Sequence, residues 1–164
     1  MAELSIKCGN LFYYLEGKDL IINSTNKYML PGSGICGGIY KMAGEDKLLE
    51  YIQNTFKTEM KVNEARFTGG FDLKIDILHI FCPKYYESLN PIEDLLESYR
   101  VIFREASKRN YKNIISVSLG TGVHAYKHGD VGKYVYKELE SLVNQYNINF
   151  CLVLADPNTK KYYV

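Results

Sequence analysis

Short runs of consecutive apolar residues constrain the fold of this chain more than any other feature. Examples are the Leu-Ile-Ile run at 20–22 and the Ile-Leu-His-Ile-Phe run at 77–81. A strand that is apolar on both sides is buried on both faces, as in a parallel sheet covered by helices. We therefore expect strands at Leu4–Cys8, Leu20–Ser24, Ala65–Thr68, Ile75–Phe81, Asn113–Ser118 and Asn149–Leu154.

Helical periodicities fill the stretches between these runs. Pro91 suits the first turn of one such helix, and Asp130 is placed to cap the last. The alternation of strands and helices predicts a three-layer α/β sandwich, to which Lys160–Val164 is expected to add an edge strand. The predicted helices cover Ile35–Met42, Asp46–Phe56, Ile92–Arg109 and Val131–Gln145.

Composition excludes several classes of function. The 164 residues carry 20 basic and 19 acidic side chains without a basic run, so no nucleic-acid partner is expected. No apolar run reaches the roughly 18 residues of a membrane-spanning helix, and the first residues lack the apolar core of a signal peptide, so we expect a cytoplasmic protein that binds no membrane. The four cysteines form no Cys-x-x-Cys pair, which argues against a zinc cluster or a disulfide framework.

Two connections between a strand and a helix contain glycines. The first is Asn23–Asn26 followed by Pro31–Gly38, and the second is Ser118–Tyr126. Each follows the C-terminal end of a buried strand, where open α/β sheets hold their ligands. Glycines let backbone N–H groups approach an anion closely, so two such loops facing each other would suit a diphosphate, although glycines in such turns also serve geometry alone.

The segment Gly32–Gly37 matches the dinucleotide pattern G-x-G-x-x-G. It begins eight residues after Ser24, where the preceding strand is expected to end, and no strand ending in an acidic residue follows about 20 residues later. We therefore reject a Rossmann dinucleotide site.

Several segments stand in an order that matches one protein family. Asp19–Asn26 reads D-L-I-I-N-S-T-N, Gly34–Gly44 reads G-I-C-G-G-I-Y-K-M-A-G, and Gly120–Tyr126 reads G-T-G-V-H-A-Y. They resemble the V-N-A-A-N, G-V-x-G-A-I with A-A-G, and S-T-G-V-Y-G-Y segments of macrodomains, which bind ADP-ribose. The resemblance implies a single macrodomain over residues 1–164, a three-layer α/β/α sandwich with a mixed central sheet. Shorter matches lie at Gly9-Asn10, Thr68–Gly70, Leu78-His79 and Ser98-Tyr99.

The resemblance also implies which residues contact the ligand. Gly34, Ile35 and the backbone of Gly120–Val123 would cradle the diphosphate. Asn26 would hydrogen-bond the distal ribose, whereas Asn23 is expected to tie the loop to its own backbone. Asn10 replaces the family's aspartate, and its carbonyl could still accept from the adenine amino group. The ligand-binding residues we expect are Gly9, Asn10, Asn23, Asn26, Gly34, Ile35, Cys36, Gly120, Thr121, Gly122, Val123, His124, Ala125, Tyr126 and Ala155.

The expected catalytic machinery departs from that of the family. Hydrolases of the family with the strongest acid/base site have an aspartate ten residues after the second asparagine, where this chain has Cys36. We expect hydrolysis of mono-ADP-ribosylated protein or small ADP-ribose esters without a carboxylate, with the substrate's own phosphate helping to position water and Asn26 holding the distal ribose. A non-catalytic reader of ADP-ribose, or a binder of a related nucleotide metabolite, remains the alternative.

His124 is the second candidate catalytic residue. It stands where the family has an aromatic residue over the distal ribose, and a histidine there could act as acid or base or simply pack. Cys36 as a nucleophile with His124 or His79 as its base is a further alternative, although His79 is expected to be structural. His124 and His128 are four residues apart, but Gly129 and the lack of a third ligand argue against a metal. No metal and no cofactor are expected.

The adenine end of the predicted site departs from the family as well. Ala155, just before Asp156, stands where the family has an aromatic residue beneath the adenine. We expect weaker adenine binding, or stacking on another tyrosine such as Tyr162. The expected partner is ADP-ribose or an ADP-ribosylated protein, bound by a monomer.

Overall fold

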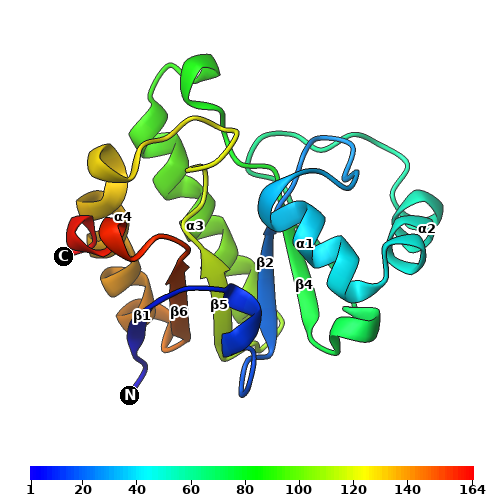
Figure 1. The fold of residues 1–164 in the computed structure, drawn as a ribbon, viewed down its shortest axis with the longest axis horizontal. Helices are drawn as coiled ribbons and strands as arrows, with labels where there is room; N and C mark the ends of the chain where they lie inside the picture. The colour runs from blue at the N-terminus through cyan, green and yellow to red at the C-terminus, as the bar shows by residue number, and fades with distance from the viewer.

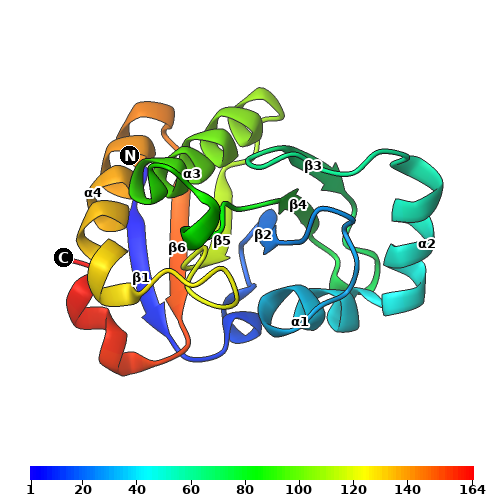
Figure 2. The ribbon, with the colours of Figure 1, turned by 90° about the horizontal axis from the view of Figure 1, so that it is seen from above.

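The computed structural model describes all residues, 1–164, and places a six-stranded sheet between two layers of helices (Figures 1 and 2). The strand order is β1-β6-β5-β2-β4-β3. Only β3 runs antiparallel, against β4, so the sheet is mixed, as expected. The strands are β1 (Leu4–Cys8), β2 (Leu20–Ser24), β3 (Ala65–Thr68), β4 (Asp76–Ile80), β5 (Asn113–Val117) and β6 (Asn149–Leu154).

The helices cover both faces of this sheet. Figure 2 shows α3 and α4 side by side on one face and α1 on the other, with α2 beyond the β3 end of the sheet. None of these helices combines the length and the apolar composition that crossing a bilayer requires. The α-helices are α1 (Gly34–Ala43), α2 (Glu45–Thr55), α3 (Pro91–Lys108) and α4 (His128–Tyr146), and the 3-10 helices are η1 (Leu11–Tyr14), η2 (Phe71–Leu73), η3 (Tyr85–Glu87) and η4 (Pro157–Tyr162).

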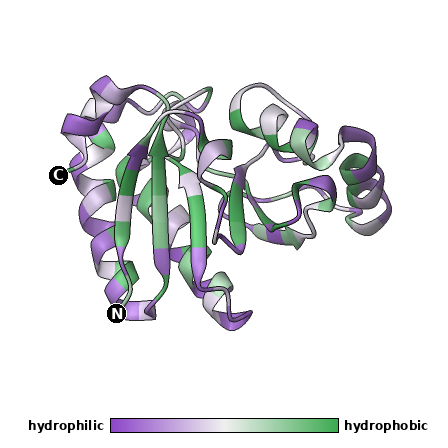
Figure 3. Ribbon diagram, turned by 60° about the horizontal axis from the view of Figure 1, so that its bottom comes forward, coloured by the Kyte–Doolittle hydropathy of each residue, from purple (hydrophilic) through white to green (hydrophobic).

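Successive side chains of a strand point to opposite faces of the sheet, so the strands contribute to two hydrophobic cores. In β2, Leu20 and Ile22 pack into the core beneath α3 and α4, while Ile21 packs into the core beneath α1 and α2. All three side chains are fully buried, and each contributes about 1.5–3 kcal/mol relative to an exposed position. Figure 3 shows the hydrophobic colouring concentrated on the strands. The apolar runs therefore produce strands that are buried on both faces, as predicted.

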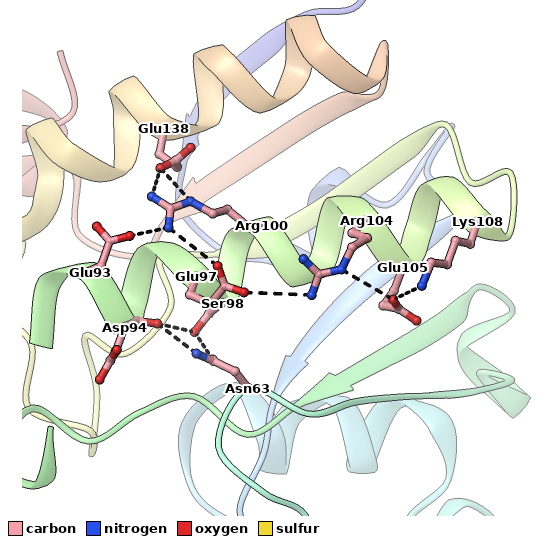
Figure 4. Close-up of polar contacts among 10 residues, drawn as sticks. All are labelled: Asn63, Glu93, Asp94, Glu97, Ser98, Arg100, Arg104, Glu105, Lys108 and Glu138. Carbon is pink, nitrogen blue, oxygen red and sulfur yellow. Dashed lines mark hydrogen bonds and ion pairs between the residues drawn. The ribbon is translucent and has the colours of Figure 1, made fainter. Parts of the chain in front are cut away.

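An ion-pair network ties α3 to α4 on their outer surface (Figure 4). The Nη2 and Nε atoms of Arg100 lie 2.6 Å and 3.1 Å from one carboxylate oxygen of Glu138 in α4. Arg100 also donates to Glu93 in its own helix. One guanidinium therefore contacts carboxylates of both helices.

A second polar cluster in Figure 4 attaches the loop before β3 to α3. Asn63 adopts a left-handed backbone conformation with φ 64°. Its amide donates to the carbonyl oxygen of Asp94 at 3.0 Å and accepts from the hydroxyl of Ser98. The polar side chain of Ser98 is thus satisfied although it is fully buried.

Two local predictions were wrong. Lys160–Val164 does not add an edge strand, because η4 occupies most of this segment. The side chain of Asp156 accepts from the N–H of Asn158, and Pro157 follows it, so this sequence starts a helical turn. Asp130 does not cap α4, which begins at His128, so its carboxylate lies inside the first turn, where it favours the helix dipole.

Candidate functional site

A cleft of about 360 Å³ opens at the C-terminal ends of the parallel strands. Its walls come from the connections that follow β2, β5 and β6. This is the edge at which open α/β sheets hold ligands, because loops from neighbouring strands meet there. The lining consists of Ser24, Ser33–Ile35, Val117–His124, His128 and Val153–Asp156.

The first wall is the N-terminus of α1. Ser33 precedes the helix in extended conformation and makes no side-chain cap, and Gly34 has φ 63°. The first N–H groups of the helix therefore have no side-chain acceptor, which leaves them free to bind an anion. A Cβ at Gly37 would lie 2.1 Å from the carbonyl oxygen of Gly32, so the loop can close onto the first turn only because residue 37 is glycine.

The second wall is the loop after β5. Gly120 has φ 78°, and a Cβ there would lie 2.7 Å from the ring of Tyr126. Tyr126 in turn donates from its N–H to the carbonyl of Gly120 and from its hydroxyl to the carbonyl of Pro91. The loop is therefore held against the start of α3. Gly122 and Val123 at its tip are exposed, and a Cβ at Gly122 would meet nothing within 4 Å.

The structure gives the loop-tying role expected of Asn23 to the other asparagine of the first loop. Asn26, not Asn23, ties the loop to its own backbone. The Asn26 amide donates to the carbonyl of Leu30 at 2.8 Å, and its oxygen accepts from the N–H groups of Tyr28 and Leu30. Neither asparagine belongs to the lining of the cleft. The Asn26 side chain satisfies three backbone groups and so sets the shape of this loop.

Asn23 is fully buried and contacts a buried histidine instead. Its Nδ2 lies 3.0 Å from Nδ1 of His79, and Nε2 of His79 lies 2.8 Å from the hydroxyl of Thr68. If Nδ1 accepts from the amide, Nε2 carries the proton and donates to Thr68. Burial lowers the pKa of His79 to about 3, so the ring is neutral. This supports the structural role expected for His79.

Cys36 is not arranged as a nucleophile. Its thiol lies 3.7 Å from the Thr25 hydroxyl and 3.5 Å from the Leu30 carbonyl, and it hydrogen-bonds to neither candidate histidine. Burial raises the pKa of the thiol, which disfavours the reactive thiolate. The structure therefore gives no support to the pairing of Cys36 with His124 or His79.

His124 lines the cleft with its ring held by the protein. Its Nδ1 lies 3.2 Å from the carbonyl oxygen of Pro83, so Nδ1 carries the proton. The ring packs edge to face on Phe81, at 6.2 Å between centroids. Its backbone carbonyl accepts from the N–H of Tyr85. The imidazole is thus fixed in orientation, with Nε2 free of protein partners.

Several other predicted site residues lie outside the lining of the cleft. The Asn10 side chain caps η1 by accepting from the N–H of Phe12 at 2.9 Å, and Gly9 donates its N–H to Leu154 in β6. Tyr162 packs over Gly129 of α4 and is not part of the lining. The predicted residues that do line the cleft are Gly34, Ile35, Gly120, Thr121, Gly122, Val123, His124 and Ala155, while Cys36, Ala125 and Tyr126 are not among the lining residues.

Five polar residues of the lining were not among the expected ligand-binding residues: Ser24, Ser33, Ser118, His128 and Asp156. Two of them, Ser118 and His128, share a partner. Both bond to the hydroxyl of Tyr163, at 2.6 Å from Ser118 Oγ and 2.6 Å from His128 Nδ1. Burial raises the pKa of Tyr163 to about 12. Burial also lowers the pKa of His128, and the nearby carboxylate of Asp156 partly opposes this. No sequence signal links Tyr163 to these residues, because the contact depends on the path of η4.

Comparison with known proteins places these features in a family. The Macro domain model matches residues 22–135. An O-acetyl-ADP-ribose deacetylase from Klebsiella pneumoniae is 24% identical over 132 residues, covering 79% of this chain and 75% of that protein.

Two solved structures share the fold. The Trypanosoma brucei macrodomain in complex with ADP-ribose has a TM-score of 0.82 at 22% identity, covering 98% of this chain and 67% of that one. The Oceanobacillus iheyensis macrodomain with ADP has a TM-score of 0.87 at 23% identity, covering 99% and 88%.

Proposed function

The chain belongs to the Macro domain family, and from this premise we propose that residues 1–164 form one macrodomain that binds ADP-ribose in the cleft. The proposal rests on one observation: the two glycine-containing loops, after β2 and after β5, form opposite walls of the same cleft. The N-terminus of α1 at Gly34 and Ile35 offers unpaired N–H groups, and the loop Gly120–Val123 offers a second set. A diphosphate between them would accept hydrogen bonds from both walls.

Calorimetric titration of ADP-ribose tests this proposal. Gly122→Glu places a carboxylate at the tip of the second loop, where the structure has room for the side chain and the backbone needs no positive φ. We expect wild-type protein to bind and the variant to lose binding, because the carboxylate repels the diphosphate. Gly69→Glu is the matched control, since Gly69 is also exposed with open space around it but lies outside the cleft. Equal binding by wild type and Gly122→Glu would place the ligand elsewhere.

We further propose that the domain hydrolyses ADP-ribose linkages, such as those of mono-ADP-ribosylated protein or small ADP-ribose esters, without a catalytic carboxylate. The name of the Klebsiella relative, O-acetyl-ADP-ribose deacetylase, supports an ester substrate. The neutral Cys36 thiol cannot act as a general base, so the substrate's own phosphate positions the water. Asn26 contributes by fixing the loop that faces the distal ribose.

Single-turnover release of ADP-ribose or acetate checks the hydrolytic part of the proposal. Asn26→Ala should slow release more than it weakens ADP-ribose binding. Without the Asn26 side chain the loop can still contact the ligand, but it no longer holds the distal ribose in the orientation that hydrolysis requires. His124→Gln tests whether the free Nε2 takes part in proton transfer. Release that is unchanged by both substitutions would remove both residues from the mechanism.

A non-catalytic reader of ADP-ribose is the second candidate. Two observations favour it: the Cys36 thiol is buried with a raised pKa, and both polar atoms of the Asn26 side chain are already bonded within the loop. A reader would bind ADP-ribose with loss of binding in Gly122→Glu, yet release nothing in single-turnover assays.

A further inference from the structure

The hydroxyl of Tyr163 joins two residues that line the cleft from different elements. Ser118 follows β5, and His128 begins α4. Tyr163 itself is only 1% exposed. Its position is fixed by close packing, since a Cβ at Gly132 of α4 would lie 2.5 Å from the carbonyl oxygen of Tyr162. The Tyr163 hydroxyl therefore holds the His128 ring in one orientation at the wall of the cleft.

The cleft contains no lysine or arginine in its lining. A diphosphate placed there would meet backbone N–H groups but no permanent positive charge. The only lining side chains that can become cationic are His124 and His128. His124 is buried against Phe81, whereas His128 is partly exposed and its Nε2 has no protein partner.

We propose that His128 takes up a proton when a diphosphate ligand enters the cleft, and that Tyr163 is the positioning residue that holds its ring for this role. The inference rests on the proposed binding of ADP-ribose and assigns to that site a cationic residue. A negatively charged ligand favours the protonated imidazole, so the ligand and the proton bind cooperatively.

The hydrogen bonds around Tyr163 accommodate both charge states of His128. With a neutral ring, the tyrosine O–H donates to Nδ1 and accepts from the Ser118 hydroxyl, which leaves Nε2–H for the ligand. With a protonated ring, Nδ1–H donates to the tyrosine oxygen, whose O–H then donates to Ser118. Because a serine hydroxyl can donate or accept, no buried group loses its partner in either state.

The burial of His128 and the charged groups around it determine how readily its ring is protonated. Burial lowers the pKa of the ring in the free protein, and the Asp156 carboxylate partly opposes that effect. Tyr163 is neutral because its pKa is raised to about 12. Lys127 and Asp130 of its own segment are exposed, and His124 lies in the same cleft. An uncharged His128 in the free protein is thus poised to gain a proton when anionic charge arrives.

Calorimetry with ADP-ribose at about pH 5.5 and about pH 8 tests the proton uptake, because this window spans histidine titration. If the ligand raises the pKa of His128 by about one unit, binding is tighter at the lower pH, by a factor that approaches about tenfold only when the lower pH is well below the pKa of the free protein. His128→Gln should reduce this ratio to about twofold or less, while Lys127→Gln, a control at an exposed neighbour outside the cleft lining, should keep it. Equal affinities at both values of pH would overturn the inference and leave the proposed function intact, whereas no binding at either would overturn both.

Nuclear magnetic resonance gives a readout that does not depend on affinity. The chain has three histidines, and His79 does not titrate in this window because its pKa is about 3. Comparison with His128→Gln then identifies the imidazole signal of His128. The pKa of His128 should rise when ADP-ribose is added, and an unchanged or lower pKa would overturn the inference.

Tyr163→Phe tests the positioning role. The substitution keeps the buried ring but removes the hydroxyl that bonds to His128 and Ser118. We expect a smaller ratio of affinities between the two values of pH than in wild type, with ADP-ribose still bound. A wild-type ratio in this variant would show that His128 needs no support from Tyr163.

Discussion

The Nδ2 atom of Asn23 lies 3.0 Å from Nδ1 of His79 in the adjacent strand β4, and both side chains are fully buried. The contact requires an unprotonated Nδ1, because a protonated ring would present a donor to the amide nitrogen. The neutral state of His79 is therefore part of the folded structure.

Stability should fall as pH drops from about 6.5 towards 3, because unfolded His79 takes up a proton near its ordinary pKa, whereas the folded pKa is about 3. Above about 6.5 both states are neutral, and the full stability is present. The loss amounts to at most about 1.4 kcal/mol per pH unit for this residue. Urea unfolding at several pH values between about 7 and 5 measures how the free energy of unfolding changes with pH. This window lies above the pH range in which most carboxylates titrate. His79→Gln should have a smaller slope, and the same slope in both proteins would contradict the assignment.

Thr68→Val should destabilise the protein by about 1–3 kcal/mol, because Nε2–H of His79 loses its only acceptor inside the protein. Valine has nearly the same shape, so packing is preserved. Thr55→Val is the control, since Thr55 is exposed at the end of α2 and should change stability by about 0.5 kcal/mol or less. Denaturant midpoints of the two variants compare them directly.

Gly120→Ala should destabilise the domain by more than about 1 kcal/mol, because the added methyl meets the Tyr126 ring at a backbone with φ 78°. Gly122→Ala, two residues away in the same loop, should be close to neutral, since its Cβ would meet open space. Thermal unfolding of both variants provides the comparison. Equal effects would mean that the loop relaxes around residue 120.

Arg100→Met keeps the aliphatic part of the side chain and removes the charge between α3 and α4. The expected loss is about 1 kcal/mol or less at low salt and smaller at high salt, because Arg100 is partly exposed. Lys108→Met, which removes an exposed pair with Glu105 within α3, should have a smaller effect. A loss that does not change with salt would argue that packing of the stem, not charge, dominates.

The central strands could be predicted to within a residue because a strand buried on both faces is a continuous apolar run, whatever its distant contacts are. Ile77–Phe81 is apolar whatever its neighbours are. The end of the chain has no such apolar run: a strand was expected at Lys160–Val164, but the Asp156-Pro157 pair starts a 3-10 helix there. In this short segment the cap formed by Asp156, not an apolar pattern, determines the secondary structure.

The site residues that act through their backbone could be predicted from the sequence, whereas the roles of individual side chains were harder to predict. The glycines at 34, 120 and 122 line the cleft, as their pattern indicated. The roles of Asn23 and Asn26 could not be assigned, because two asparagines three residues apart have the same chemistry and differ only in which one faces the core. His128 was considered only as a metal ligand, since its link to Tyr163 spans 35 residues.

The pairing of β1 with β6 bears on how the protein forms during synthesis. β1 is made first but can join the sheet only after Asn149–Leu154 has left the ribosome. The third wall of the cleft, with Ala155, Asp156 and the supporting Tyr163, follows in the next few residues. A nascent chain that has exposed residues 1–126 already carries both glycine loops, yet it lacks β6, which pairs with β1, and Tyr163, which supports His128. Ligand cannot meet a finished site on a partly made chain.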